Sequence, residues 1–409
     1  MQLYSLSPTT GPIPPEKIPG RSKEIEEIYN HTKVKSLVLT MIRRMGKTLL
    51  LQKFAHITVK EGRANKAIWF DLMRVGDVTD LTDTLLIRLH QEQSWLKLNL
   101  ERCKELYNKY RPTGDITLST GVPLLPEISF KLPEFKTEWK KALTACIEDL
   151  ANRKAENGEI ITLILDEFPY MLWNWILDGK VKDVIELLNL FRSIRMSLQE
   201  KNNIRFIICG SIGLDVVMNH LKTEYKYTAE PFNDMKPYIL EAMTNQDTHF
   251  LCSCLALSGF DFEEDKDICI QKIGFLTENL PFYINKIFEI LNSSFNSKIN
   301  LINVQGAFNE LINNVNDDEV FEQLDTRIAL YYPKQKDAMF TILDFLSKQQ
   351  NQIQEEEIIN SVDIEAKDVR DYLRTLSKDQ YLVRTIIDEK RYYEFKYKIF
   401  RKWWKLNKV

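Results

Sequence analysis

The sequence lacks any long apolar run: its 409 residues contain no stretch of about 18 apolar residues, which is what a membrane-spanning helix needs. Its N-terminus, MQLYSLSPTTGPIPPEK, lacks a basic region followed by an apolar segment, so no signal peptide is predicted. The six cysteines and five histidines are scattered. Cys252 and Cys254 lie close, but without a second pair or nearby histidines they give weak support for a metal site. We expect a cytoplasmic protein, bound to no membrane, with reduced core cysteines.

The charge of the chain is nearly balanced, with a net value of −3 that neither favours nor opposes nucleic acid. Its distribution is less even, because residues 390–409 hold eight lysines or arginines and one acid, Glu394. This terminal segment is either a solvated face or a contact for a polyanion, and the sequence leaves both open. The length predicts two or three domains.

Short apolar runs alternate with helical periodicity in the first half of the chain. Strands are predicted at 36–40, 67–71, 160–165 and 204–209. Helices are predicted at 21–31, 47–60, 79–92, 96–110, 136–152 and 181–200, and an excursion or hairpin at 113–135. This alternation is typical of βαβ units, in which helices cover both faces of a parallel sheet.

The β signal fades after about residue 215, and residues 235–325 are predicted to be mostly helical. Three short helices follow, at 336–349, 355–361 and 365–379. Two strands, at 381–387 and 391–397, flank Asp388-Glu389-Lys390. Three helices followed by a β-hairpin indicate a winged helix.

A phosphate-binding loop is predicted between the strand at 36–40 and the helix at 47–60. The P-loop pattern is G-x-x-x-x-G-K-[ST]; Gly46, Lys47 and Thr48 match it, whereas Met41 replaces its first glycine. Gly46 allows close approach of the backbone to an oxygen, and the helix that follows offers N–H groups and a positive dipole end. Lys47 suits the β- and γ-phosphates, and the Thr48 hydroxyl suits Mg²⁺.

Two features of this loop leave alternatives open. Met41 narrows the torsions available to the loop and weakens nucleotide affinity if the first turn needs glycine. Arg43 and Arg44 are either cations beside phosphate or partners of surface acids. A Gly-Lys-Thr sequence that merely opens a helix is disfavoured by the strand before it and the amphipathic helix after it.

Two acids, Asp166 and Glu167, end the apolar strand at 160–165. In a P-loop protein Asp166 would hold Mg²⁺, and Glu167 would orient or deprotonate the attacking water. The alternative is that the pair caps a helix. Ser211 follows the strand at 204–209 and is a candidate contact for the γ-phosphate or the water, unless Gly210-Ser211 is a plain turn.

In this order, the motifs resemble the STAND branch of AAA+-like ATPases, and in particular its archaeal/bacterial "ATPase domain" group. The similar segments are Pro19–Glu24 (G-R-E-x-E), Arg43–Thr48 (P-R-R-x-G-K-T), Leu165–Tyr170 (D-E-F/I), Cys209–Ser211 (G-S), Asn279–Tyr283 (G-x-P-x-Y) and the aromatic-rich Lys398–Lys405. Met41 and Ile42 depart from the family's small residue and proline, Ser22 replaces an acid, and Asn279 replaces glycine. The resemblance covers residues from about 11 to 405.

The resemblance implies an α/β fold with a P-loop NTPase parallel-sheet core, a helical lid and a C-terminal winged helix. The expected segments are an extended arm (1–20), the core (21–234), the lid (235–332) and the winged helix (333–409). ATP and Mg²⁺ are the expected cofactors. The expected nucleotide contacts are Arg21, Arg43, Arg44, Met45, Gly46, Lys47, Thr48, Leu49 and Pro281, with Arg21 and Pro281 near the adenine. The expected catalytic residues are Glu167, Lys47 and Ser211, and the metal ligands are Thr48 and Asp166.

The leading functional hypothesis is a Mg–ATP-binding and ATP-hydrolysing switch, of a kind that in this family often serves bacterial defence or regulation. The alternatives are a nucleotide-responsive DNA-binding regulator and a non-hydrolysing scaffold with a degenerate loop. Nucleic acid would contact residues 365–409, although the helix at 365–379 carries four basic and four acidic residues. Trp403 and Trp404 either stack on a base or pack on their own domain. A protein effector and an oligomeric state are left open.

Overall fold

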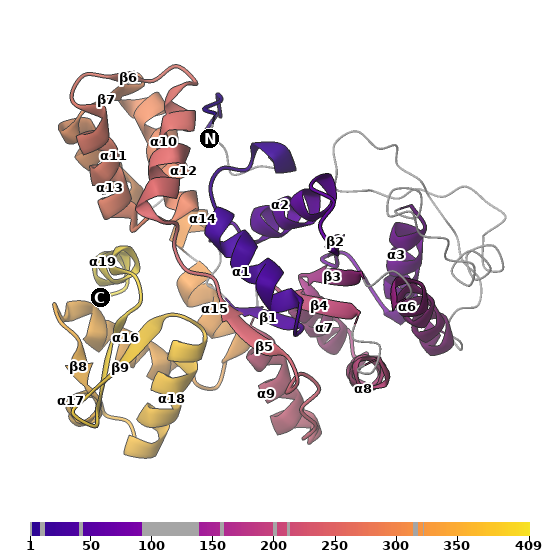
Figure 1. Cartoon of the computed structure of the whole chain (residues 1–409). Coiled ribbons are helices and arrows are strands. Elements are labelled where there is room, and N and C mark those ends of the chain that lie inside the picture. Colours follow the sequence, from indigo (N-terminus) through magenta and orange to yellow (C-terminus); the bar gives the residue numbers. More distant parts are fainter. Residues whose placement is uncertain are drawn as a thin grey trace. The chain divides into compact units, whose positions relative to one another are not determined.

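The computed structural model describes residues 2–8, 13–40, 44–91, 139–155, 159–198, 203–210, 213–313, 318–321 and 323–409. These residues fall into two compact units (Figure 1). The sheet unit comprises Ser22–Thr40 and Thr48–Ile239, and the lid–wing unit comprises Met1–Arg21, Met41–Lys47 and Leu240–Val409. The helix predicted at 96–110 and the hairpin predicted at 113–135 lie outside the described residues.

A five-stranded parallel sheet forms the centre of the sheet unit, in the order β2-β3-β4-β1-β5. Its strands are β1 (Leu37–Thr40), β2 (Asn65–Asp71), β3 (Ile160–Asp166), β4 (Ile204–Cys209) and β5 (Lys236–Ile239). All six residues of β4 are buried, as expected for a strand with helices on both faces. The predicted parallel α/β sheet is confirmed.

Sequence reasoning missed β5, which lies in the stretch predicted to be mostly helical. This strand pairs with β1 at one edge of the sheet and is largely exposed. It contains Pro237, which lacks a backbone N–H and is therefore tolerated only at an edge. A four-residue exposed strand has no apolar run by which it could be recognised.

Helices flank the strands of the sheet unit. They are α1 (Ser22–Thr32), α2 (Lys47–Lys60), α3 (Val78–Gln91), α6 (Trp139–Ala155), α7 (Phe168–Leu177), α8 (Val181–Ser197) and α9 (Leu214–Tyr225). A buried polar chain ties α1 to the sheet: Asn65 Nδ2 donates to Thr32 Oγ1 (2.6 Å), and Thr162 Oγ1 donates to Asn65 Oδ1 (2.8 Å). Because buried polar groups must be paired, this chain fixes how α1 meets β2 and β3.

Helices dominate the first part of the lid–wing unit, as predicted for 235–325. They are η1 (Pro15–Lys17), α10 (Asn245–Ala256), α11 (Lys266–Thr277), α12 (Pro281–Ser294), α13 (Leu301–Asn313), α14 (Asp318–Phe321) and α15 (Gln323–Tyr331), with the short strands β6 (Asp261–Phe262) and β7 (Lys298–Ile299). Side chains cap the N-termini of α10 and α11: Thr244 accepts from the amide of Asp247 (3.0 Å), and Asp265 accepts from that of Ile268 (3.0 Å). No helix in the described part of the chain is long and apolar enough to cross a membrane.

The last part of this unit has the winged-helix pattern. It comprises α16 (Lys336–Lys348), β8 (Ile353–Gln354), α17 (Glu355–Ser361), α18 (Ala366–Lys378), β9 (Leu382–Ile387), β10 (Lys390–Phe395) and α19 (Lys398–Asn407), with an antiparallel sheet in the order β8-β10-β9. Trp403 stacks on Phe321 with ring centroids 5.4 Å apart, and Trp404 Nε1 donates to Asp344 Oδ1 (2.7 Å). Both tryptophans are buried, so they pack within their own unit.

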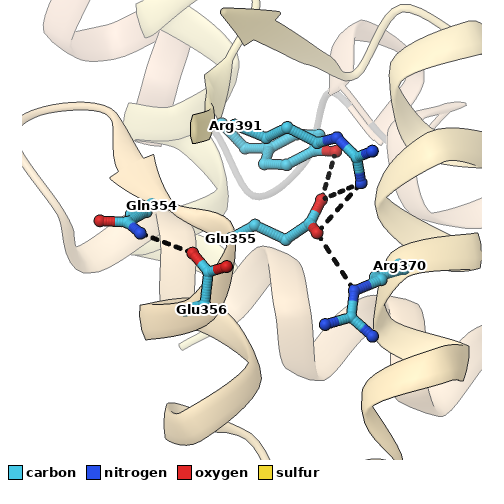
Figure 2. Close-up of polar contacts among 6 residues, drawn as sticks. Gln354, Glu355, Glu356, Arg370 and Arg391 are labelled. Carbon is cyan, nitrogen blue, oxygen red and sulfur yellow. Dashed lines mark hydrogen bonds and ion pairs between the residues drawn. The ribbon is translucent and has the colours of Figure 1, made fainter. Parts of the chain in front are cut away.

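One buried carboxylate joins the helices and the hairpin of the winged helix (Figure 2). Glu355, which is only 5% exposed, accepts from Arg370 Nε of α18 (3.2 Å), Arg391 Nη1 of β10 (3.2 Å) and the Tyr393 hydroxyl (3.1 Å). Burial and the neighbouring Glu355 charge raise the pKa of Tyr393 to about 12. Two cations of the expected nucleic-acid surface are thereby paired with an acid.

Replacing Glu355 with alanine would leave Arg370, Arg391 and Tyr393 without this acceptor. We expect the free energy of unfolding to fall by about 1–3 kcal/mol. The loss is limited because both arginines are half-exposed, so water replaces part of their lost hydrogen bonding to Glu355. Urea unfolding measures the change. Glu356→Ala is the matched control, because the exposed Glu356 side chain bonds Gln354 at the surface (Figure 2). Equal losses in the two variants would contradict the buried role of Glu355.

The stability of the sheet unit is expected to depend on the protonation of Asp83 in α3. Burial raises the pKa of Asp83 to about 7, and the charges of Asp80 and Asp77 act in the same direction. The unfolded value is about 3.9, so between the two values only the folded protein holds the proton, and the free energy of unfolding falls as pH rises. Asp83→Asn should stabilise the protein at pH 8 by about 1 kcal/mol after allowance for solvent screening, and should change little at pH 4. Thermal unfolding across pH tests this, with the exposed Asp388→Asn as control; a gain that does not depend on pH would refute it.

Candidate functional site

Asp166 lies at the carboxyl end of β3, where it gathers several donors. It is 1% exposed, and Thr48 Oγ1 in the first turn of α2 donates to its Oδ2 at 2.8 Å. Trp69 Nε1 donates to the same oxygen at 3.4 Å. Cys209 Sγ (3.3 Å) and the amide of Glu167 (3.0 Å) donate to Oδ1. The two predicted metal ligands, Thr48 and Asp166, are therefore in direct contact.

The donor set at this position fits a magnesium ion. A hydroxyl and a carboxylate, both oxygen ligands, meet where a helix begins and a parallel strand ends. Mg²⁺ binds through oxygen and usually keeps several waters while using one or two protein ligands. Thr48 and Asp166 would supply those protein ligands.

Glu167 follows Asp166 in a left-handed backbone conformation, with φ of 59°. It occupies the N-cap position of α7, but its side chain makes no capping hydrogen bond. The helix-capping alternative is therefore wrong for Glu167. A non-glycine residue in this conformation costs about 1 kcal/mol or more, and such strain is concentrated at functional sites.

A third acid belongs to this group. Asp71 ends β2 in register with Asp166 of β3. Burial raises the pKa of Asp71, and the charges of Asp166 and Glu167 raise it further. Asp71 therefore experiences repulsion from two carboxylates at and just after the end of the adjacent strand, and a bound cation would offset this repulsion.

Sequence reasoning missed Trp69, Asp71 and Cys209 as neighbours of Asp166. The carboxyl ends of parallel strands meet at one edge of a sheet. Asp71 and Cys209 are the last residues of β2 and β4. This rule could therefore have predicted that both lie near Asp166. Trp69 carried no such signal, because an aromatic residue inside a strand is ordinarily a core residue.

Arg21 contacts the predicted phosphate loop within the lid–wing unit. Nη2 of Arg21 donates to the carbonyl of Met45 (3.1 Å), and Nη1 donates to that of Glu241 (2.8 Å). Arg21 is 4% exposed, and both Arg21 and Gly20 are left-handed, with φ of 66°. The guanidinium therefore joins the loop to the segment that leads into α10.

Arg44 and Gly46 bring the loop against the start of α12. The Arg44 guanidinium lies 4.0 Å from the centre of the Phe282 ring, in a cation–π contact. Gly46 has φ of 77°, and a Cβ at that position would lie 3.7 Å from Pro281 Cγ. Five predicted nucleotide contacts are thus close together in this unit: Arg21, Arg44, Met45, Gly46 and Pro281.

The remaining predicted residues are placed as follows. Lys47 is the first residue of α2, is mostly buried and directly precedes Thr48 in the chain. Leu49 lies in the first turn of the same helix and is half-buried. Arg43 and Ser211 lie outside the described residues, as does Met41.

The fold is similar to those of proteins with solved structures. A Walker-type ATPase of Pyrococcus abyssi has a TM-score of 0.60 at 15% identity, over 97% of this chain and 99% of its own. The ORC2 protein of Aeropyrum pernix, solved as ADPNP–ADP complexes, has a TM-score of 0.50 at 11% identity, over 97% of this chain and 96% of its own. No protein-family model and no curated protein matches the sequence. The sheet order, the helical region, the winged helix and these likenesses together give the chain the fold of an AAA+-like P-loop ATPase.

Proposed function

We propose that the protein binds Mg–ATP and hydrolyses it. The observation that carries this proposal is the 2.8 Å hydrogen bond between Thr48 and Asp166. It joins the residue after the Gly-Lys pair to the acid that ends β3, which are the two signature positions of P-loop enzymes. The fold shared with a Walker-type ATPase and with a protein solved with ADPNP and ADP supports the same conclusion.

The chemistry follows from the residue types. In this proposal Lys47 binds the β- and γ-phosphates, the glycine loop with Arg43 and Arg44 surrounds them, and Thr48 with Asp166 holds Mg²⁺. When bound, Mg²⁺ neutralises charge on the transferred phosphoryl group. Glu167 accepts a proton from the attacking water or orients it, and Ser211 contacts the γ-phosphate or that water. In the same proposal, Pro281 and Arg21 contact the adenine ring of the nucleotide.

A switch role is part of the proposal. Arg21 bonds the Met45 carbonyl of the loop and the Glu241 carbonyl that precedes α10. A loop that moves on binding phosphate would strain or break one of these two hydrogen bonds. Nucleotide binding would therefore change the conformation of the segment that precedes α10. Once ATP is hydrolysed and the phosphate leaves, the loop returns and both Arg21 hydrogen bonds form again.

Nucleotide binding is tested by calorimetry with Mg–ATP. We expect Lys47→Ala to weaken binding at least about tenfold, because a charge-assisted contact to phosphate is lost. Thr48→Val should remove most of the affinity that Mg²⁺ adds, so its affinity should match that of wild type in EDTA. Thr223→Val, at an exposed position of α9, is the control. If the wild-type protein gives no binding heat with Mg–ATP, the proposal is wrong, and a scaffold with a degenerate loop is the better interpretation.

Hydrolysis is tested by phosphate release from wild type and Glu167→Gln. The variant keeps its size but cannot accept a proton, so turnover should fall about 10²-fold or more while ATP affinity is retained. Glu230→Gln, which replaces an exposed acid, is the control. Retained turnover in Glu167→Gln would remove Glu167 from the mechanism. If wild type binds ATP but releases no phosphate, the nucleotide-binding regulator is the better reading.

A further inference from the structure

A hollow of about 1100 Å³ lies within the lid–wing unit. Residues of α10, of α11 and of the start of α19 line it, and Figure 1 labels these three helices. None of the residues proposed to bind nucleotide lines it. Small-molecule sites commonly measure about 300–1,000 Å³, so this hollow is large for a metabolite. Its size suits a short segment of polypeptide.

Apolar side chains form much of its wall. Ile270 and Leu276 come from α11, Phe308 from α13 and Ile399 from α19. Phe275 of α11 also lines the hollow and is 74% exposed. An aromatic side chain left in water beside a concave apolar surface is typical of a position that anchors a partner.

The charge of the lining is positive. Lys398 and Lys402 lie one turn apart on α19, are exposed and line the hollow. Glu278 is the one acid among the lining residues that the structure describes, and its Oε2 accepts from the amide of Ile399 at 2.8 Å. That acid is therefore engaged by the first turn of α19, and the lysines favour an acidic partner.

Carboxamides supply part of the polar lining. Asn245, Gln246, Gln271 and Asn279 all line the hollow, and Asn279 Nδ2 donates to Asn245 Oδ1 at 2.9 Å. A carboxamide both donates and accepts, which matches the alternating groups of a peptide backbone. An anion without amides, such as a lipid headgroup, would leave many hydrogen-bonding groups of these carboxamides without a matching partner.

We propose that this hollow binds an acidic peptide segment of a partner protein. An apolar or aromatic side chain of the segment packs against Phe275 and Leu276, both of which have exposed surface, and its carboxylates pair with Lys398 and Lys402. The carboxamides hold its backbone. This docking function is separate from nucleotide binding, so either proposal can fail without the other.

The test begins with a random dodecapeptide display library selected against the full chain. The expected result is enrichment of acidic residues beside an aromatic or large aliphatic residue. A fluorescein-labelled peptide from that selection is then titrated by fluorescence anisotropy. The double variant Lys398→Glu/Lys402→Glu and the single variant Phe275→Ala should each bind at least about tenfold more weakly, and binding to wild type should weaken as salt rises.

Lys405→Glu is the matched control, because Lys405 is exposed on the same helix but does not line the hollow. It should bind the peptide within about twofold of wild type. Unchanged thermal unfolding of each variant shows that it folds. A selection without acidic enrichment, equal peptide affinity for wild type and the double variant, or an equal loss in Lys405→Glu would overturn the proposal. Lysine-dependent binding of labelled oligothymidylate in preference to the peptide would assign the surface to nucleic acid instead.

Discussion

The contact between Thr48 and Asp166 is the constraint on which the account of the site depends. A hydroxyl at the start of α2 and a carboxylate at the end of β3 meet at 2.8 Å, although they lie 118 positions apart in the chain. The parallel sheet makes this meeting possible, since all its strands deliver their carboxyl ends to one edge. Asp71 of β2 and Cys209 of β4 reach the same place for the same reason.

The predicted phosphate loop connects the sheet unit to the lid–wing unit covalently, because the boundary between the two units falls within it. Lys47 belongs to the lid–wing unit and Thr48 to the sheet unit, so one peptide bond separates the two groups of predicted nucleotide contacts. Arg21, Arg44 and Gly46 hold the loop against the backbone of Glu241 and against Pro281 and Phe282. Left-handed torsions at Gly20, Arg21, Arg44 and Gly46 shape the backbone there. They are free of steric cost at the two glycines, and the contacts of the Arg21 and Arg44 guanidinium groups compensate for their cost at the two arginines.

The sequence was most informative where one apolar pattern dominates. β4 and α2 have the predicted bounds, because an apolar run interrupted only by Arg205 and a glycine followed by a periodic helix are strong local signals. The two motifs predicted that Thr48 and Asp166 bind the same Mg²⁺, which requires the two side chains to lie close together. Other features depend on tertiary pairing that no local pattern encodes: Pro237 in an edge strand, Trp69 beside Asp166, Glu355 between two arginines, and the hollow beside Phe275.

The most direct measurement is a crystal structure with ADPNP and Mn²⁺ in place of Mg²⁺, in which anomalous scattering locates the metal. We expect a metal peak about 2.0–2.3 Å from Thr48 Oγ1, with Asp166 bound to the metal directly or through one water and the nucleotide phosphates beside Lys47. A peak elsewhere, or a bound nucleotide with the direct bond between Thr48 and Asp166 intact and no metal next to it, would contradict the account.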